Sequence, residues 1–387
     1  MDAQRFDPAA LMAEAQEETG LSDWGDEAFR EPLSILCESL ETEAGLNARG
    51  RDRLRRRLVG DLAQRLGVVA DRTREPAIAQ VALPAPIIVT GNGRSGTTLM
   101  HKLLALDPAH RPVLLWETRR PSPPPEAAHW LDDPRIEEIE RELADDGYKQ
   151  PDAMARHHFG ADQPEECSTT LALACVGGIY GAMARTPTYT AYRETADFHA
   201  AYGFHRSVLQ ALMFRGRGGR LVLKAPEHMF HLPELLATYP DAVVVQMHRD
   251  PARVIPSLIS IVAKMQSFYA DEVDVAAIRR MRMGYSDIMN RLPAIRAGLD
   301  RPGRFFDMQY LDLEEDQIGA VRGLYAAMGL AFTGAYQARL EGFIARNPRN
   351  RFGAHAYSLA DYDLTLADID RAFGPYIEAN GVRLERR

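Results

Sequence analysis

Apolar residues recur along this chain at two spacings, and the change between them predicts where helices and strands lie. Up to about residue 74, leucines stand one helical turn apart, as at Leu54, Leu58 and Leu62, which is typical of amphipathic helices. Short apolar runs of strand length then appear at 87–89, 221–223 and 242–246, and 304–309 could add a further strand. Helical patterns separate these runs, and strands that alternate with helices favour a parallel sheet.

The same patterns divide the chain into an N-terminal part and a larger remainder. Residues 1–80 are expected to form a helical extension, and residues 81–387 an α/β domain with a helical insertion at about 126–215. We therefore predict an α/β fold in which a P-loop-like parallel sheet is flanked by helices. Ligands in such sheets bind beyond the carboxyl ends of the strands.

Composition and charge exclude several classes of protein. The chain has 387 residues and a net charge of −8, which disfavours nucleic acid and long polyanions as partners. The three cysteines, Cys37, Cys167 and Cys175, are unevenly spaced and odd in number. This is typical of reduced thiols rather than of a disulfide framework or a zinc site, so we expect no metal.

The sequence also bears on localisation. The first 20 residues are acidic and lack a continuous apolar core, unlike a secretory signal. The longest apolar stretch, 171–184, is too short to span a bilayer and is expected to form one buried helix. We therefore expect a cytoplasmic protein without a membrane span.

The first predicted strand leads into a glycine-rich loop, GNGRSGTT at 91–98. Glycines let several backbone N–H groups converge, and the end of the following helix adds partial positive charge, so the loop is a candidate anion site. Against the nucleotide-triphosphatase pattern G-x-x-x-x-G-K-[ST], Gly91 and Gly96 fit but Thr97 replaces the lysine. Arg94 supplies a cation inside the loop instead. The simpler alternative is a glycine-rich turn with an exposed arginine.

A second candidate anion site follows the predicted strand at 242–246. Arg249 leaves the end of that strand, Asp250 can cap the next helix, and Ser257 lies two turns further on. Arg249 and Ser257 can therefore converge on one anion. The alternative is that Arg249 pairs with Asp250 or with another surface carboxylate.

Together these features resemble the sulfotransferases that use 3′-phosphoadenosine 5′-phosphosulfate (PAPS), in a bacterial branch with some similarity to tyrosylprotein sulfotransferases. The resemblance covers most of the chain and implies the sulfotransferase fold. It implies that the first loop binds the 5′-phosphosulfate through Gly93, Arg94, Ser95, Gly96, Thr97 and Thr98. It implies that Arg249 and Ser257 bind the 3′-phosphate. A C-terminal loop with Arg351 and Gly353 would close over that phosphate, although Phe352 stands where the family has a cation.

The same resemblance suggests catalytic residues. Glu117 begins a Glu-Thr-Arg sequence similar to that of tyrosylprotein sulfotransferases, where the Glu is the base, although two residues are inserted before it. Lys224 is similar to that group's lysine, and with Arg94 it would stabilise the developing charge. His228 is the alternative base, because imidazole titrates near neutral pH, unless it is a packed helix residue.

Other roles remain open for these acids. Glu117 could pair with Arg119 or Arg120 instead of acting as a base. The neighbouring Glu165 and Glu166 are further acids near the insertion, and we interpret them as a solvated helix start.

We therefore expect a PAPS-dependent sulfotransferase that transfers a sulfuryl group to a hydroxyl or amine of a small-molecule acceptor, without a metal. The alternatives are an ATP- or GTP-dependent small-molecule kinase and a non-catalytic nucleotide-binding module. A kinase would need magnesium, yet 242–247 carries no acid to hold it and the loop lysine is absent. The patterns do not identify the acceptor, the residues that hold the adenine or the oligomeric state.

Overall fold

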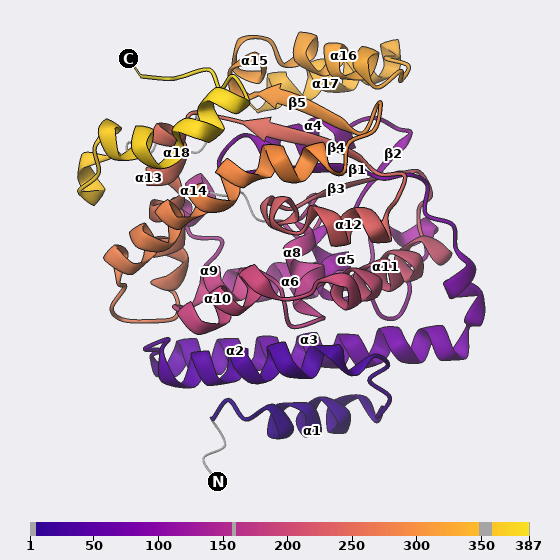
Figure 1. Ribbon diagram of the computed structural model, residues 1–387. Coiled ribbons are helices and arrows are strands. Elements are labelled where there is room, and N and C mark those ends of the chain that lie inside the picture. The colour runs from indigo at the N-terminus through magenta and orange to yellow at the C-terminus, as the bar shows by residue number, and fades with distance from the viewer. Residues whose placement is uncertain (1–4, 157–159, 348–357, 387) are drawn as a thin grey trace.

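The structure, a computed structural model, describes residues 5–156, 160–347 and 358–386. At its centre is a five-stranded parallel sheet with the strand order β2-β3-β1-β4-β5 (Figure 1). The strands are β1 (Ile87–Gly91), β2 (His110–Pro112), β3 (Arg220–Lys224), β4 (Val243–His248) and β5 (Phe305–Gln309). The predicted α/β fold is confirmed, and so are the four predicted strands, which correspond to β1, β3, β4 and β5. β2 was not predicted, because its three residues are too few to display a periodicity.

The arrangement of the strands brings three chain segments to one edge of the sheet. β1 lies at the centre and pairs with β3 on one side and with β4 on the other. Because all strands are parallel, β1, β3 and β4 end together, at Gly91, Lys224 and His248. The segments that follow these ends therefore start beside one another, where ligands bind in open α/β sheets.

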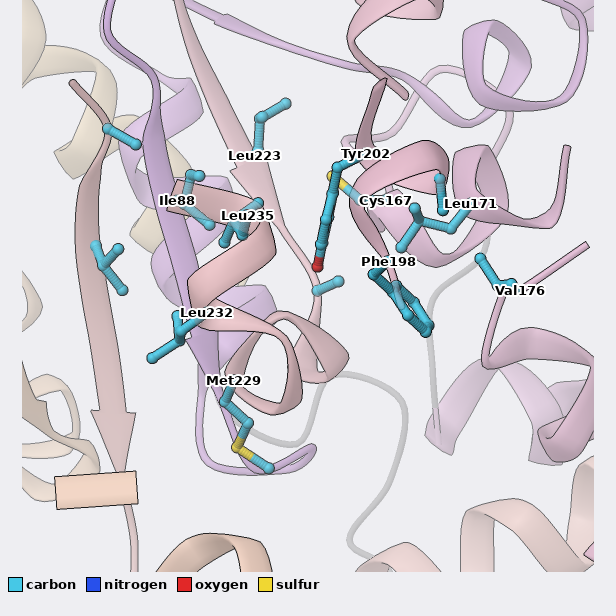
Figure 2. Close-up of a cluster of buried hydrophobic side chains, with 14 of the residues drawn as sticks. Ile88, Cys167, Leu171, Val176, Phe198, Tyr202, Leu223, Met229, Leu232 and Leu235 are labelled. Atoms are coloured by element: carbon cyan, nitrogen blue, oxygen red, sulfur yellow. The ribbon is translucent and has the colours of Figure 1, made fainter. Parts of the chain in front are cut away.

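Alternate residues of β1 point into two hydrophobic cores, one on each face of the sheet. The helices that follow β1, apart from those within residues 126–215, are α4 (Thr97–Ala105), α5 (Leu115–Arg119), α12 (Leu232–Thr238), α13 (Pro251–Gln266), α14 (Val275–Ala297), α15 (Tyr310–Glu315), α16 (Gln317–Ala327), α17 (Gly334–Arg346) and α18 (Leu366–Ala379). Ile87 and Val89 pack with α4, α16 and α17. Ile88 packs on the other face with α12 and α13, and Figure 2 shows it near Leu223 and Leu235. Helices thus cover both faces, as a parallel sheet requires.

Three helices precede the sheet, α1 (Pro8–Thr19), α2 (Arg30–Thr42) and α3 (Ala48–Arg74). Leu58 and Leu62 of α3 are buried in a third core together with Trp116 and Tyr180. Figure 1 shows these helices at the end of the molecule away from the sheet. They therefore pack mainly against helices of residues 126–215 rather than against the sheet itself.

The described residues of the segment 126–215, which we expected to be an insertion, are mainly helical. The segment contains α6 (Pro134–Asp145), α7 (Pro151–Arg156), α8 (Cys167–Ala172), α9 (Ile179–Met183), α10 (Pro187–Thr195) and α11 (His199–Phe214). The apolar stretch 171–184 is not the single helix expected, because Cys175 has a positive φ of 57° between α8 and α9. The chain there packs so closely that a Cβ on Gly177 would lie 2.4 Å from the carbonyl oxygen of Ser168. No helix of the described ranges is both long and apolar enough to cross a membrane.

Candidate active site

The loop after β1 has the backbone geometry of an anion cradle. Gly91 and Gly96 have positive φ angles of 130° and 92°, and a Cβ on Gly91 would lie 2.4 Å from the carbonyl oxygen of Met247 in β4. α4 begins at Thr97 with Gly96 as its N-cap, and no side chain of the N-cap satisfies its first N–H groups. Those N–H groups are the ones that bind an anion at a helix N-terminus.

Arg94, inside this loop, joins it to the second predicted anion site. Its Nε donates a hydrogen bond of 2.9 Å to Oγ of Ser257 on α13. Arg249, directly after β4, donates through Nη1 to the carbonyl oxygen of Arg94 at 3.1 Å, and its guanidinium lies 3.7 Å from the ring centroid of Tyr310. Residues that are 155 positions apart in the sequence therefore form one continuous wall.

Arg249 also forms an ion pair with a carboxylate near the C-terminus. Its Nε and Nη2 lie 2.8 and 3.0 Å from Oε1 and Oε2 of Glu385. The backbone N–H of Glu385 donates to Oδ2 of Asp250 at 2.9 Å, and Arg253 donates to the Glu385 carbonyl oxygen at 3.0 Å. Asp250 itself caps α13 through the N–H of Ala252. Arg249 therefore does pair with a carboxylate, as the alternative in the sequence analysis allowed. The partner is Glu385, which no sequence motif indicates.

Lys224, the last residue of β3, holds an acidic residue beside the loop. Its ammonium contacts Oε1 of Glu166 and lies 3.4 Å from Oγ1 of Thr98, and its side chain is buried. Glu165 and Glu166 both line the cleft in front of the loop. Burial raises the pKa of Glu165 above its ordinary value, against the opposing charge of Lys224. The two acids do precede a helix, as expected, because Glu166 is the N-cap of α8. They are not simply solvated, since Glu166 pairs with Lys224.

Glu117, predicted as the base, lies elsewhere. Its carboxylate is fully buried and pairs with both terminal nitrogens of Arg111, with Nη1 at 2.8 Å from Oε2. Oε2 also accepts a hydrogen bond of 2.9 Å from the N–H of Leu114, which closes the N-terminus of α5. Glu117 does not line the cleft, so the geometry assigns it a structural role. The alternative partners were also wrong, because Arg119 and Arg120 both pair with Glu142.

His228, the alternative base, is a packed core residue. Its Nδ1 lies 2.9 Å from the hydroxyl of Tyr202, and its Nε2 is buried without a partner among the described residues. Burial, reinforced by the neighbouring His205, His231 and Lys224, holds the pKa of His228 well below its ordinary value. Because His228 does not line the cleft, the structure does not support a role as base.

A cleft of about 440 Å³ contains some of the remaining predicted residues. Those that line it are Gly93, Arg94, Gly96, Thr97, Thr98 and Arg249. Lys224 does not line it, but contacts Glu166 and Thr98, which do. Ser95 is buried instead, and its Oγ donates to the carbonyl oxygen of Asn92 at 2.5 Å, so it maintains the shape of the loop. Ser257 reaches the cleft only through Arg94. Arg351 and Gly353 lie outside the described residues, and their role stays a prediction.

The other half of the cleft is mainly apolar. Side chains from α9, α13 and the segment after β3 line it, among them Ile179, Met229, Phe230, Leu258, Ile261 and Met265. An ion pair, Arg193 with Glu227, interrupts this surface, and Glu227 Oε2 also accepts a hydrogen bond from the N–H of Gly178 at 2.9 Å. Within the described ranges, no three or more His, Cys, Asp or Glu side chains are grouped so that they could hold a metal ion.

Known proteins share both the sequence and the architecture of this chain. The Sulfotransferase family model matches residues 86–334. Omega-hydroxy-beta-dihydromenaquinone-9 sulfotransferase Stf3 of Mycobacterium bovis is 26% identical over 331 residues, which are 81% of this chain and 78% of that protein. The crystal structure of sulfotransferase STF1 from Mycobacterium tuberculosis H37Rv has a TM-score of 0.82 and 32% identity, covering 94% of this chain and 97% of that chain. The crystal structure of sulfotransferase STF9 from Mycobacterium avium has a TM-score of 0.89 and 28% identity, covering 98% of this chain and 98% of that chain.

Proposed function

This chain belongs to the sulfotransferase family, and from that membership we propose that it transfers a sulfuryl group from PAPS to a hydroxyl group of a small-molecule acceptor. The observation that carries the proposal is the wall on which the glycine loop, Arg94, Ser257 and Arg249 meet at the carboxyl edge of the sheet. The relative Stf3 is named for an omega-hydroxy compound, which supports a hydroxyl as the acceptor group.

The residues of this wall fit the two anionic ends of PAPS. The N–H groups at the start of α4, which the N-cap leaves unsatisfied, and Arg94 suit the 5′-phosphosulfate. Arg249 and Ser257 suit the 3′-phosphate, since a guanidinium and a hydroxyl both donate to phosphate oxygens. Tyr310, which lies against Arg249, completes this end of the cleft.

Lys224 and Glu166 stand where the chemistry would take place. PAPS supplies an activated sulfuryl group on a 5′-phosphate leaving group. The Lys224 ammonium has three donors, so it can hold Glu166 and also stabilise charge that develops on the transferring group. Glu166 takes the role of base for the acceptor hydroxyl, because its carboxylate lines the cleft and Lys224 holds it beside the loop that would bind the sulfuryl donor.

Calorimetry with 3′-phosphoadenosine 5′-phosphate (PAP) tests the proposal. We expect PAP in EDTA to bind about tenfold or more tightly than ATP with magnesium, because two separate cationic sites match its two phosphate positions. Transfer from labelled PAPS to a panel of alcohols, phenols and amines then measures activity. Tighter binding of ATP with magnesium would favour the kinase alternative, and PAP binding without transfer to any acceptor would favour the binding module.

A second prediction concerns Glu385. Its carboxylate forms an ion pair with the guanidinium of Arg249, which we assign to the 3′-phosphate. Glu385→Gln should tighten PAP binding about five- to tenfold, because the phosphate no longer displaces a competing charge. Arg249→Ala should weaken PAP binding by about 2–3 kcal/mol. Calorimetry on both variants measures these changes.

Adenosine 5′-phosphosulfate is the control ligand, because it lacks the 3′-phosphate. Its affinity should be the same in wild type, Glu385→Gln and Arg249→Ala. A change in its affinity that matches the change for PAP would show that Glu385 acts through the folding of the C-terminal segment rather than through competition for Arg249.

A further inference from the structure

The apolar half of the cleft contains a charged residue that the sulfuryl-transfer site does not use. Arg282 lies on α14 and lines the cleft together with Met281 and Tyr285 of the same helix. The ring of Tyr285 packs against Phe230, with 5.2 Å between the ring centroids, which places this group among the apolar residues after β3.

Arg282 is largely removed from solvent and has few partners. It is 8% exposed, and its Nη1 donates to the hydroxyl of Tyr285, above whose ring the guanidinium carbon lies at 4.9 Å. Its Nε is buried without a hydrogen-bond partner, and no carboxylate of the described residues forms an ion pair with it. A buried guanidinium without an anion is unfavourable, since desolvation of its charge is not offset.

Two other cationic side chains in or beside the cleft each have a carboxylate partner. Lys224 pairs with Glu166, and Arg193 pairs with Glu227. Glu227 is thereby neutralised within the apolar half, so it does not cancel the charge of Arg282. Among the described residues that line the cleft, Arg282 therefore carries a positive charge that no carboxylate neutralises.

From this arrangement we propose that Arg282, oriented by Tyr285, binds an anionic group of the acceptor. The acceptor is then an apolar alcohol that carries a carboxylate or phosphate in addition to the hydroxyl that is sulfated. A guanidinium matches the planar, two-oxygen face of such groups, and the surrounding apolar residues suit a hydrocarbon between the two ends. This inference rests on the proposed sulfuryl transfer and specifies the acceptor of the same site.

Omega-hydroxy fatty acids and their methyl esters form a matched series of probes, since the ester removes only the negative charge. With labelled PAPS and the wild-type protein, we expect kcat/KM for 12-hydroxydodecanoate or 16-hydroxyhexadecanoate to exceed that for the ester about ten- to a hundredfold. Arg282→Met should abolish the preference, mainly through a higher KM for the acid, and should lower kcat/KM for the acid far more than for the ester. Arg282→Lys should keep part of the preference, because the charge remains but the fork geometry is lost.

Arg280→Met is the matched control, because Arg280 is exposed on the same helix. It should keep the full preference for the acid. Calorimetry of the acid and the ester on the PAP-bound protein gives a second readout without turnover, and the acid should bind about tenfold more tightly.

The proposal is overturned if the wild type does not distinguish acid from ester. It is also overturned if Arg282→Met slows both probes equally, or if PAP binds but no member of the acid series is sulfated or bound. Failure of the proposed function is a separate result, namely that the wild type binds no PAP.

Discussion

Replacing Glu166 by Gln is expected to lower kcat about a hundredfold while the affinity for PAP stays close to that of the wild type. Gln keeps the size of the side chain and an oxygen that can accept from Lys224, but it cannot take the proton of the acceptor hydroxyl. Steady-state kinetics with labelled PAPS, together with calorimetry of PAP, measures both quantities. The prediction follows from the contact between Glu166 and Lys224 beside Thr98.

Glu165→Gln is the matched control, since Glu165 lines the same cleft and is the adjacent residue. Its loss of turnover should be clearly smaller. If Glu165→Gln is the slower variant, the base is Glu165, whose pKa is raised above its ordinary value by burial. Loss of PAP binding in Glu166→Gln would show that Glu166 only orders Lys224 and the loop.

Replacing Glu117 by Gln should lower the free energy of unfolding by about 3–5 kcal/mol, because it leaves the buried Arg111 without a counter-charge. Both side chains of this ion pair are completely buried. Urea denaturation followed by circular dichroism measures the loss. In the protein that remains folded, kcat should be close to that of the wild type, because Glu117 does not line the cleft.

A double variant, Arg111→Met with Glu117→Leu, removes both charges of the ion pair. It distinguishes the loss of the ion pair from the cost of leaving Arg111 buried without a counter-charge. It should be more stable than Glu117→Gln alone, since apolar residues of similar volume often replace a buried ion pair at little cost. If Glu117→Gln kept its stability and bound PAP but lost turnover, the base would be Glu117 as the resemblance suggested, and the role given to Glu166 would be wrong.

Much of the fold could be predicted from local patterns. The four predicted strands, the helices around them and the glycine loop all depend on residues close together in the sequence. Gly91 and Gly96 were recognised as turn residues, and both have the positive φ that glycine adopts most readily. The two errors in the predicted elements also have local causes. β2 is too short to show a period, and the stretch 171–184 is interrupted at Cys175, which has a positive φ angle.

The candidate site was predicted less completely, because the identity of a residue does not tell what it faces. The sequence indicated Arg94, Arg249 and Lys224, and the structure brings all three to one edge of the sheet. It also suggested Glu117 and His228 as bases, and both are enclosed in the protein interior. Glu117 and His228 each follow a strand. That position in the sequence does not determine where a side chain points or whether it is buried.

The sequence by itself therefore determined the elements and the loop, since helix and strand periods and glycine turns act over a few residues. Only the tertiary structure decided the partners of the charged groups. Lys224 and Glu166 are 58 residues apart, and Arg249 and Glu385 are 136 apart. A charge that is removed from water must find a counter-charge or a ligand, and the packing of distant segments determines which one is within reach. For that reason, the residues that we propose as the base, as the competitor for Arg249 and as the anion-binding group of the acceptor site could be identified only in the folded chain.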